Sequence, residues 1–141
     1  MDRVSRKHTG REHRGTALVE AAILLPILLL LLFGMVEYGG LFWRASQIEA
    51  TARTAVRAGA LSGGNTGAVN TTISSMMTAA GLSSSGYSVT LNPSDPSTRA
   101  VGSQFTVTIS VPYPNISLTK CPLVPTPATL TRSCTMAKEG G

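Results

Sequence analysis

A single carboxylate, that of Glu20, lies within an apolar run that extends from Gly15 to Val36. A carboxylate in hydrocarbon costs at least about 2.5 kcal/mol on insertion scales, so one that is kept there usually has a partner and a function. The chemistry that Glu20 can provide is that of a counter-charge, for a cation on its own helix or on a neighbouring chain. A second interpretation is structural: a glutamate at the cytoplasmic start of a helix stabilises the positive end of the helix dipole.

The apolar run can span a bilayer only if its helix includes Glu20. Residues 21–36 would reach only about 24 Å, whereas a start at Thr16 gives about 32 Å against a hydrocarbon core of about 30 Å. Five of the 12 Lys and Arg lie in the first 15 residues, and only Arg44 follows the run closely. This asymmetry predicts a cytoplasmic N-terminus and an extracytoplasmic C-terminus. The expected parts are a basic cytoplasmic leader, a transmembrane helix and an extracytoplasmic domain: residues 1–15, 16–43 and 44–141.

Other residues modify this predicted span. Pro26 cannot donate a backbone hydrogen bond, so the helix should kink or loosen there. Glu37 lies at the outer edge of the span, where we expect water to solvate its carboxylate. Three aromatic residues lie where an interfacial anchor is expected: Tyr38, Phe42 and Trp43.

Beyond the span the sequence predicts a small α+β domain. Helical periodicity continues on one face and recurs in a second, shorter segment: Ile48, Ala52, Ala55, Val56 and Gly59, then Val69, Ile73, Met76, Met77 and Ala80. The segments should end at Gly63 and Gly81, and Asn65 or Thr66 should cap the second. The period then changes to two in three stretches, which predicts a roughly three-stranded antiparallel sheet: Tyr87–Leu91, Phe105–Val111 and Leu130–Met136.

Two cysteines, Cys121 and Cys134, enclose 12 residues in the part expected outside the cell membrane. In an oxidising compartment a disulfide is chemically plausible and would contribute about 3 kcal/mol for a loop of this size. The alternative is two unpaired small residues.

An enzyme is not expected. Both histidines, His8 and His13, lie in the leader, and the sequence shows no metal-ligand cluster, no phosphate-binding glycine-rich loop and no nucleophile with a nearby base. We therefore expect no cofactor and no metal. The net charge of +5 comes mostly from the leader, and without a basic face or an aromatic platform, nucleic acid binding is not expected.

The segment Arg14 to Glu20 resembles the processing site of class III signal sequences, in which a prepilin peptidase cuts after the glycine on the cytoplasmic side. Cleavage after Gly15 would make Thr16 the new N-terminus and Glu20 the fifth residue. The wider pattern resembles the TadE-like family of tight-adherence (Flp) pilus proteins. It consists of the processing site, Leu25-Pro26, the leucine run, Gly34 to Gly39 with Glu37, and the Ala/Arg-rich helix to about Ala60.

The resemblance implies a minor pilin or pseudopilin that helps to assemble or stabilise a thin adhesive pilus. The implied partners are the lipid bilayer, other pilins or pseudopilins, the pilus assembly platform and, as processing enzyme, the prepilin peptidase. Glu20 would then pair with the new α-amine of Thr16, on its own chain or a neighbouring one. Ala21 follows Glu20 where the major Flp pilin has tyrosine, and the mature chain would be much longer than that pilin; both differences favour a minor component.

Two alternatives remain open: an uncleaved bitopic membrane anchor and a conventionally secreted binding protein. An uncleaved anchor would keep residues 1–15. Secretion needs a small-residue cleavage site soon after the apolar run, and residues 37–43 offer none that is convincing. The resemblance itself is compatible with a place in the filament, at its tip or in a membrane-resident complex.

Overall fold

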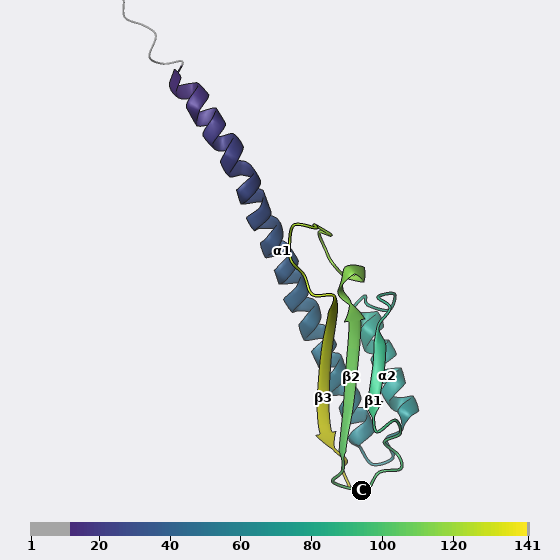
Figure 1. The fold of residues 1–141 in the computed structure, drawn as a ribbon. Helices are drawn as coiled ribbons and strands as arrows, with labels where there is room; N and C mark the ends of the chain where they lie inside the picture. Colours follow the sequence, from purple (N-terminus) through teal and green to yellow (C-terminus); the bar gives the residue numbers. More distant parts are fainter. Residues whose placement is uncertain (1–11, 141) are drawn as a thin grey trace, which may run out of the picture.

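The structure, a computed structural model, describes the backbone of residues 12–140 and the side chains of residues 15–140. Its elements are α1 (Glu12–Ala60), α2 (Thr66–Ala79), β1 (Ser88–Asn92), β2 (Gln104–Pro112), the short 3-10 helix η1 (Tyr113–Asn115) and β3 (Thr129–Ala137). In Figure 1, α1 is a long rod and the folded domain lies along its C-terminal half. The predicted α+β fold is confirmed. Most of the predicted leader lies outside the described residues.

The long helix α1 has two halves with different surroundings. Residues 15–36, apart from the half-buried Gly34, are exposed although most of them are apolar. By length and composition, α1 contains a segment able to cross a membrane. Pro26 lies inside α1, which remains helical on both sides of it. Burial begins at Glu37 and then follows one stripe of the helix: Leu41, Ala45, Ile48, Ala52, Ala55 and Val56. The periodicity predicts this stripe from Ile48 onward.

The three strands form one antiparallel sheet in the order β1-β2-β3. In the central strand, Val107 is opposite Leu91 of β1 and Cys134 of β3. The inward side chains of β2 are buried in the core that α1 shares: Phe105, Val107, Ile109 and Val111. Its outward side chains are Thr and Ser, two of which form cross-strand hydrogen bonds with β3. The apolar and polar residues that alternate along the sequence of β2 thus point to the buried and the outer face of the sheet in turn.

The second helix is short and is capped as the sequence predicts. The side chain of Asn65 accepts a hydrogen bond of 2.9 Å from the backbone N–H of Ala68, which satisfies one of the first N–H groups of α2. The helix ends before Gly81, whose φ of 69° lies in the left-handed region that favours glycine. It contributes one buried stripe to the core: Val69, Ile73 and Met77.

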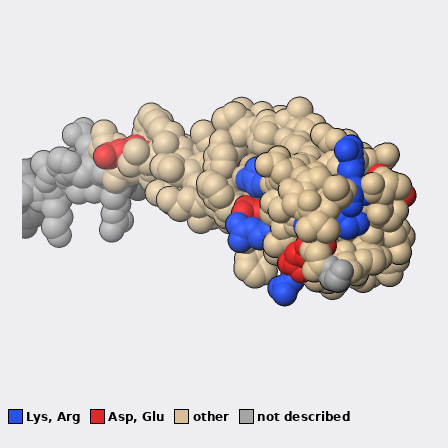
Figure 2. Space-filling view, turned by 90° about the horizontal axis from the view of Figure 1, so that it is seen from below, with Lys and Arg blue, Asp and Glu red and all other residues tan. Residues whose placement is uncertain are grey.

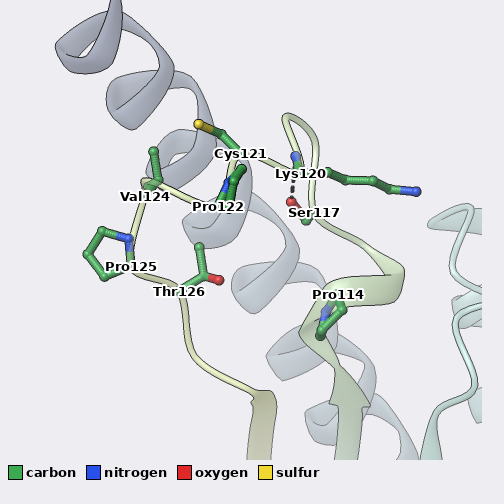
Figure 3. A pocket seen from close by; sticks show the side chains of 8 residues that line it. All are labelled: Pro114, Ser117, Lys120, Cys121, Pro122, Val124, Pro125 and Thr126. Atoms are coloured by element: carbon green, nitrogen blue, oxygen red, sulfur yellow. Dashed lines mark hydrogen bonds between the residues drawn. The ribbon is translucent and has the colours of Figure 1, made fainter. Parts of the chain in front are cut away.

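The predicted disulfide is corrected by the structure, in which Cys121 and Cys134 are both free thiols. Cys134 lies in β3, five residues beyond the start of that strand at Thr129, or about 17 Å along it. Cys121 lies on the loop before the strand, close to α1 (Figure 3). Since a disulfide needs Cα atoms within about 7 Å of each other, the fold keeps these cysteines apart.

Close packing between α1, α2 and the sheet depends on Gly59. A Cβ atom at this position would lie 2.4 Å from Cε1 of Phe105 and 2.9 Å from Cγ2 of Val69. Real Cβ atoms do not approach carbon so closely, so a larger residue would push the three elements apart. By contrast, a Cβ atom at Gly39, on the same helix, would meet nothing within 4 Å.

We therefore expect opposite effects from the same substitution at these two glycines. Gly59→Ala should lower the free energy of unfolding by about 1–3 kcal/mol, because the core is overpacked. Gly39→Ala should leave it unchanged or raise it by up to about 1 kcal/mol, because alanine favours the helix. Chemical denaturation of the full chain in mild detergent, followed by circular dichroism, measures both. Equal stability of the two variants would contradict the packing described here.

Candidate functional site

The residues of the predicted processing motif lie together at the start of α1. Gly15, Thr16 and Glu20 are helical and exposed, and the last two are four residues apart on the same face of the helix. A Cβ atom added at Gly15 would meet nothing within 4 Å. Packing among the described residues therefore does not require a glycine at this position.

Charged side chains gather on the folded domain, whereas the first half of α1 is almost uncharged (Figure 2). No Asp, Glu, Lys or Arg lies between Glu20 and Glu37. A rise of 1.5 Å per residue places these two glutamates about 26 Å apart along the helix. The apolar segment of α1 thus has one carboxylate near each end.

The carboxylate of Glu37 is buried, with only 1% of the residue exposed, so the expectation that water solvates it was wrong. Its Oε1 accepts a hydrogen bond of 2.6 Å from the hydroxyl of Tyr113. Its Oε2 accepts two from Thr119, at 2.8 Å from the backbone N–H and 2.6 Å from the hydroxyl. These three donors replace the water that burial removes, and they join α1 to a segment about 80 residues further along the chain.

The hydrogen bonds to Glu37 are charge-assisted, because a carboxylate accepts from neutral donors. Burial and the neighbouring carboxylate raise the pKa of Tyr113, so its hydroxyl stays protonated and remains a donor. Tyr113 itself is 1% exposed and continues the inward side of β2, two residues after Val111. The alternation of β2 was enough to predict that the side chain of Tyr113 points into the core. No local feature of the sequence, by contrast, connects Thr119 with Glu37.

The segment between η1 and β3, residues 116–128, is here called the junction loop, because it covers α1 where burial begins. Besides the contacts of Thr119, the hydroxyl of Tyr38 donates a hydrogen bond of 2.7 Å to the carbonyl of Pro125. Leu118 packs against Gly40 so closely that a Cβ atom there would lie 2.3 Å from its Cδ1. Three residues within about one turn of α1, at positions 37, 38 and 40, therefore hold the loop to the helix.

A cavity of about 480 Å³ lies beside the junction loop (Figure 3). It is lined by Pro114, Ser117, Lys120, Cys121, Pro122, Val124, Pro125 and Thr126. The backbone N–H of Lys120 donates to the hydroxyl of Ser117, while the long side chain of Lys120 points away from α1. The lining offers one thiol and one ammonium group but no carboxylate or imidazole. Among residues whose side chains are described, no three His, Cys, Asp or Glu lie together.

Comparison with protein families found a similarity that covers most of the N-terminal helix. Residues 15–57 match the model of the family described as TadE-like protein. This segment of the chain is similar to TadE-like proteins. Searches among curated proteins and among solved structures gave no match.

The matched segment coincides with most of α1 and begins at Gly15. It includes Glu20, the apolar stretch, Glu37 and the buried stripe from Leu41 to Val56, whereas α2 and the sheet lie outside it. The TadE-like match indicates a protein related to the tight-adherence pilus and is consistent with anchoring in a membrane. The partners of Glu37, which are Tyr113 and Thr119, belong to the unmatched part of the chain.

The hydrogen bonds of Glu37 can be tested by a double-mutant cycle. Tyr113→Phe should lower the free energy of unfolding by about 1.5–3 kcal/mol, because it removes a donor to a buried carboxylate. Glu37→Gln should cost a similar amount, and the two effects should be non-additive by about 0.5–3 kcal/mol. Chemical denaturation of the full-length variants in detergent measures all three values.

The control for Glu37→Gln is Glu49→Gln on the same helix. Glu49 forms an exposed ion pair with Arg53, four residues on, so its loss should cost no more than about 0.5 kcal/mol. If the Glu37 variant were as stable as the Glu49 variant, the buried hydrogen bonds would have no role in stability.

Proposed function

We propose that this protein is a minor pilin or pseudopilin that takes part in assembling a tight-adherence pilus. The observation that carries the proposal is the TadE-like match, which begins at Gly15 and runs through the apolar half of α1. An exposed apolar helix that continues without interruption into a small folded domain suits a subunit held in a membrane before assembly. Its partners are the bilayer, other pilins or pseudopilins and the assembly platform.

The proposed orientation is leader inside and domain outside. The five basic residues before Thr16 favour the cytoplasmic side of the membrane, because positive charge next to a span is not readily translocated. The exposed stretch from Thr16 to Val36 is about 32 Å long as a helix and fits the hydrocarbon core. The core of the folded domain, which begins to pack at Glu37, then lies beyond the outer surface of the bilayer.

A prepilin peptidase is proposed to cut between Gly15 and Thr16. This bond lies in the first two turns of α1, close to the end of the helix. Such a terminal turn opens at lower cost than the interior of a helix, so the peptidase can gain access without disturbing the folded domain. The chain is thus proposed to be the substrate of an enzyme rather than an enzyme.

Glu20 is proposed to pair with the α-amine that cleavage creates on Thr16. Both residues lie on the same face of α1 and are exposed, so the amine of the same chain or of a neighbouring chain can reach the carboxylate. An ion pair in hydrocarbon is tolerated where either charge alone is penalised. Pairing between chains would fix the axial position of one helix relative to the neighbouring helix.

Processing is tested by the N-terminal sequence and intact mass of the protein purified from membranes that contain its peptidase. We expect a chain that starts at Thr16 and keeps the apolar helix. Gly15→Leu should instead start at Met1, and because the space around Gly15 is open, α1 should be unaffected. A wild-type chain that starts at Met1 would leave an uncleaved anchor, and a start beyond Val36 would indicate a secreted protein.

The role of the carboxylate is tested separately with Glu20→Gln, which keeps the size of the side chain and removes its charge. We expect normal cleavage after Gly15 but a large loss of assembled pili, measured by quantifying sheared filaments. Glu49→Gln, which removes an exposed charge on the same helix, is the control and should assemble normally. Normal pilus output from Glu20→Gln would remove charge pairing from the mechanism.

A further inference from the structure

The tip of the junction loop lies beside the apolar half of α1. In Figure 1 the segment between η1 and β3 rises along α1 toward its N-terminal half. A groove of about 450 Å³ separates them and is lined mainly by apolar side chains: Leu30, Leu31 and Met35 of α1, and Leu123, Val124 and Pro125 of the loop. The loop therefore reaches residues that belong to the proposed membrane span.

We propose that the loop tip, Pro122–Pro125, docks in the outer leaflet of the bilayer that α1 crosses, with lipid acyl chains filling the groove. The inference rests on the proposed membrane insertion of α1. Leu30 lies six residues, or about 9 Å, before Val36 at the outer end of the span. Since the groove between the loop tip and α1 extends to Leu30, the tip then reaches below the surface of the hydrocarbon.

The helix cannot easily slide outward to lift the loop from the bilayer. A shift of about 9 Å would draw residues 10–15 of the leader, with Arg11 and Arg14, into the hydrocarbon. It would also expose to water the apolar side chains between Leu30 and Val36. In a cleaved chain, the new amine and Glu20 would move deeper instead. Charge at one end and apolar surface at the other thus fix the depth of α1.

The chemistry of the tip suits an apolar environment. Leu123 is 74% exposed, although exposing a leucine side chain to water forgoes the free energy that its burial would provide. Irregular backbone is usually kept out of hydrocarbon because its N–H and C=O groups lack partners. Here Pro122 and Pro125 have no N–H, the N–H of Val124 donates to the carbonyl of Cys121, and the carbonyl of Pro125 accepts from Tyr38. Among the described residues, the tip thus keeps only one backbone N–H without a hydrogen bond, that of Leu123.

The rim of the loop fits the headgroup layer. Lys120 lies two residues before the tip, and its side chain points away from α1 (Figure 3). A lysine at this place can keep its ammonium among lipid phosphates while the apolar tip lies deeper. The loop and α1 would then attach the domain to the bilayer at two points, which restricts its rotation about the helix axis.

The test uses single tryptophans in the full-length protein. Trp43 is the only tryptophan, so Trp43→Phe gives a background without fluorescence from this residue type. Leu123→Trp then reports on the loop tip, Leu28→Trp on the span, and Val101→Trp is the matched control. Val101 is also apolar and 69% exposed, but it lies in the turn that precedes β2 at the opposite end of the sheet.

Each variant is placed in vesicles of phosphatidylcholine and phosphatidylglycerol whose acyl chains carry bromine near either the glycerol or the methyl end. Leu123→Trp should show blue-shifted emission, lose more fluorescence to the shallow bromines than to the deep ones, and resist aqueous acrylamide. Val101→Trp should be quenched by acrylamide alone. Leu28→Trp should be quenched most by the deep bromines.

The outcomes separate this inference from the proposal on which it rests. If Leu28→Trp is quenched by lipid and Leu123→Trp only by acrylamide, α1 spans the bilayer and the loop does not dock. If Leu123→Trp resists both quenchers, a protein surface such as a second copy covers the loop, and the lipid proposal is overturned. If bromine quenches none of the variants, membrane insertion of α1 itself is wrong.

Discussion

The buried carboxylate of Glu37 is the interaction on which the arrangement of the molecule depends. It lies at the position where α1 changes from exposed on all sides to buried along one stripe. Its three donors come from Tyr113 and Thr119, so the helix and the end of the sheet are held in one relative position. Because an unsatisfied carboxylate in this place would be costly, the network specifies where the domain begins on the helix. The junction loop, its cavity and its apolar tip follow from that attachment.

The two halves of α1 show how one helix serves two environments. Between Thr16 and Val36 the apolar side chains surround the helix, and the folded domain covers almost none of them. A soluble helix would confine such residues to one face, as α1 does after Glu37. The exposed half therefore needs an apolar partner outside the folded domain, which a lipid bilayer or neighbouring helices can supply. The proposed membrane and pilus stages offer these two partners in turn.

Local periodicity was sufficient to predict the elements, because each buries one face. The spacing of Ile48, Ala52 and Val56 and the alternation from Phe105 to Val111 are both seen in the core. The junction could not be predicted in this way. Glu37 looked solvated because its donors lie 76 and 82 residues away, on a loop without periodicity. Likewise, the spacing of the cysteines did not reveal that the strand carries one of them away from the loop that holds the other.

The two glutamates that flank the apolar segment differ in what they can still bind, and this difference bears on the proposed mechanism. The oxygens of Glu37 already accept three hydrogen bonds, and the residue is 1% exposed, so another chain could reach it only after the junction loop had moved. Glu20 is exposed on the helix surface, although both glutamates lie in the segment that matches the TadE-like family. Of these two glutamates, Glu20 is therefore the one whose carboxylate can contact another chain directly. The division is physically sensible, because a charge used inside a domain stabilises the fold, whereas a charge left outside it can select a partner.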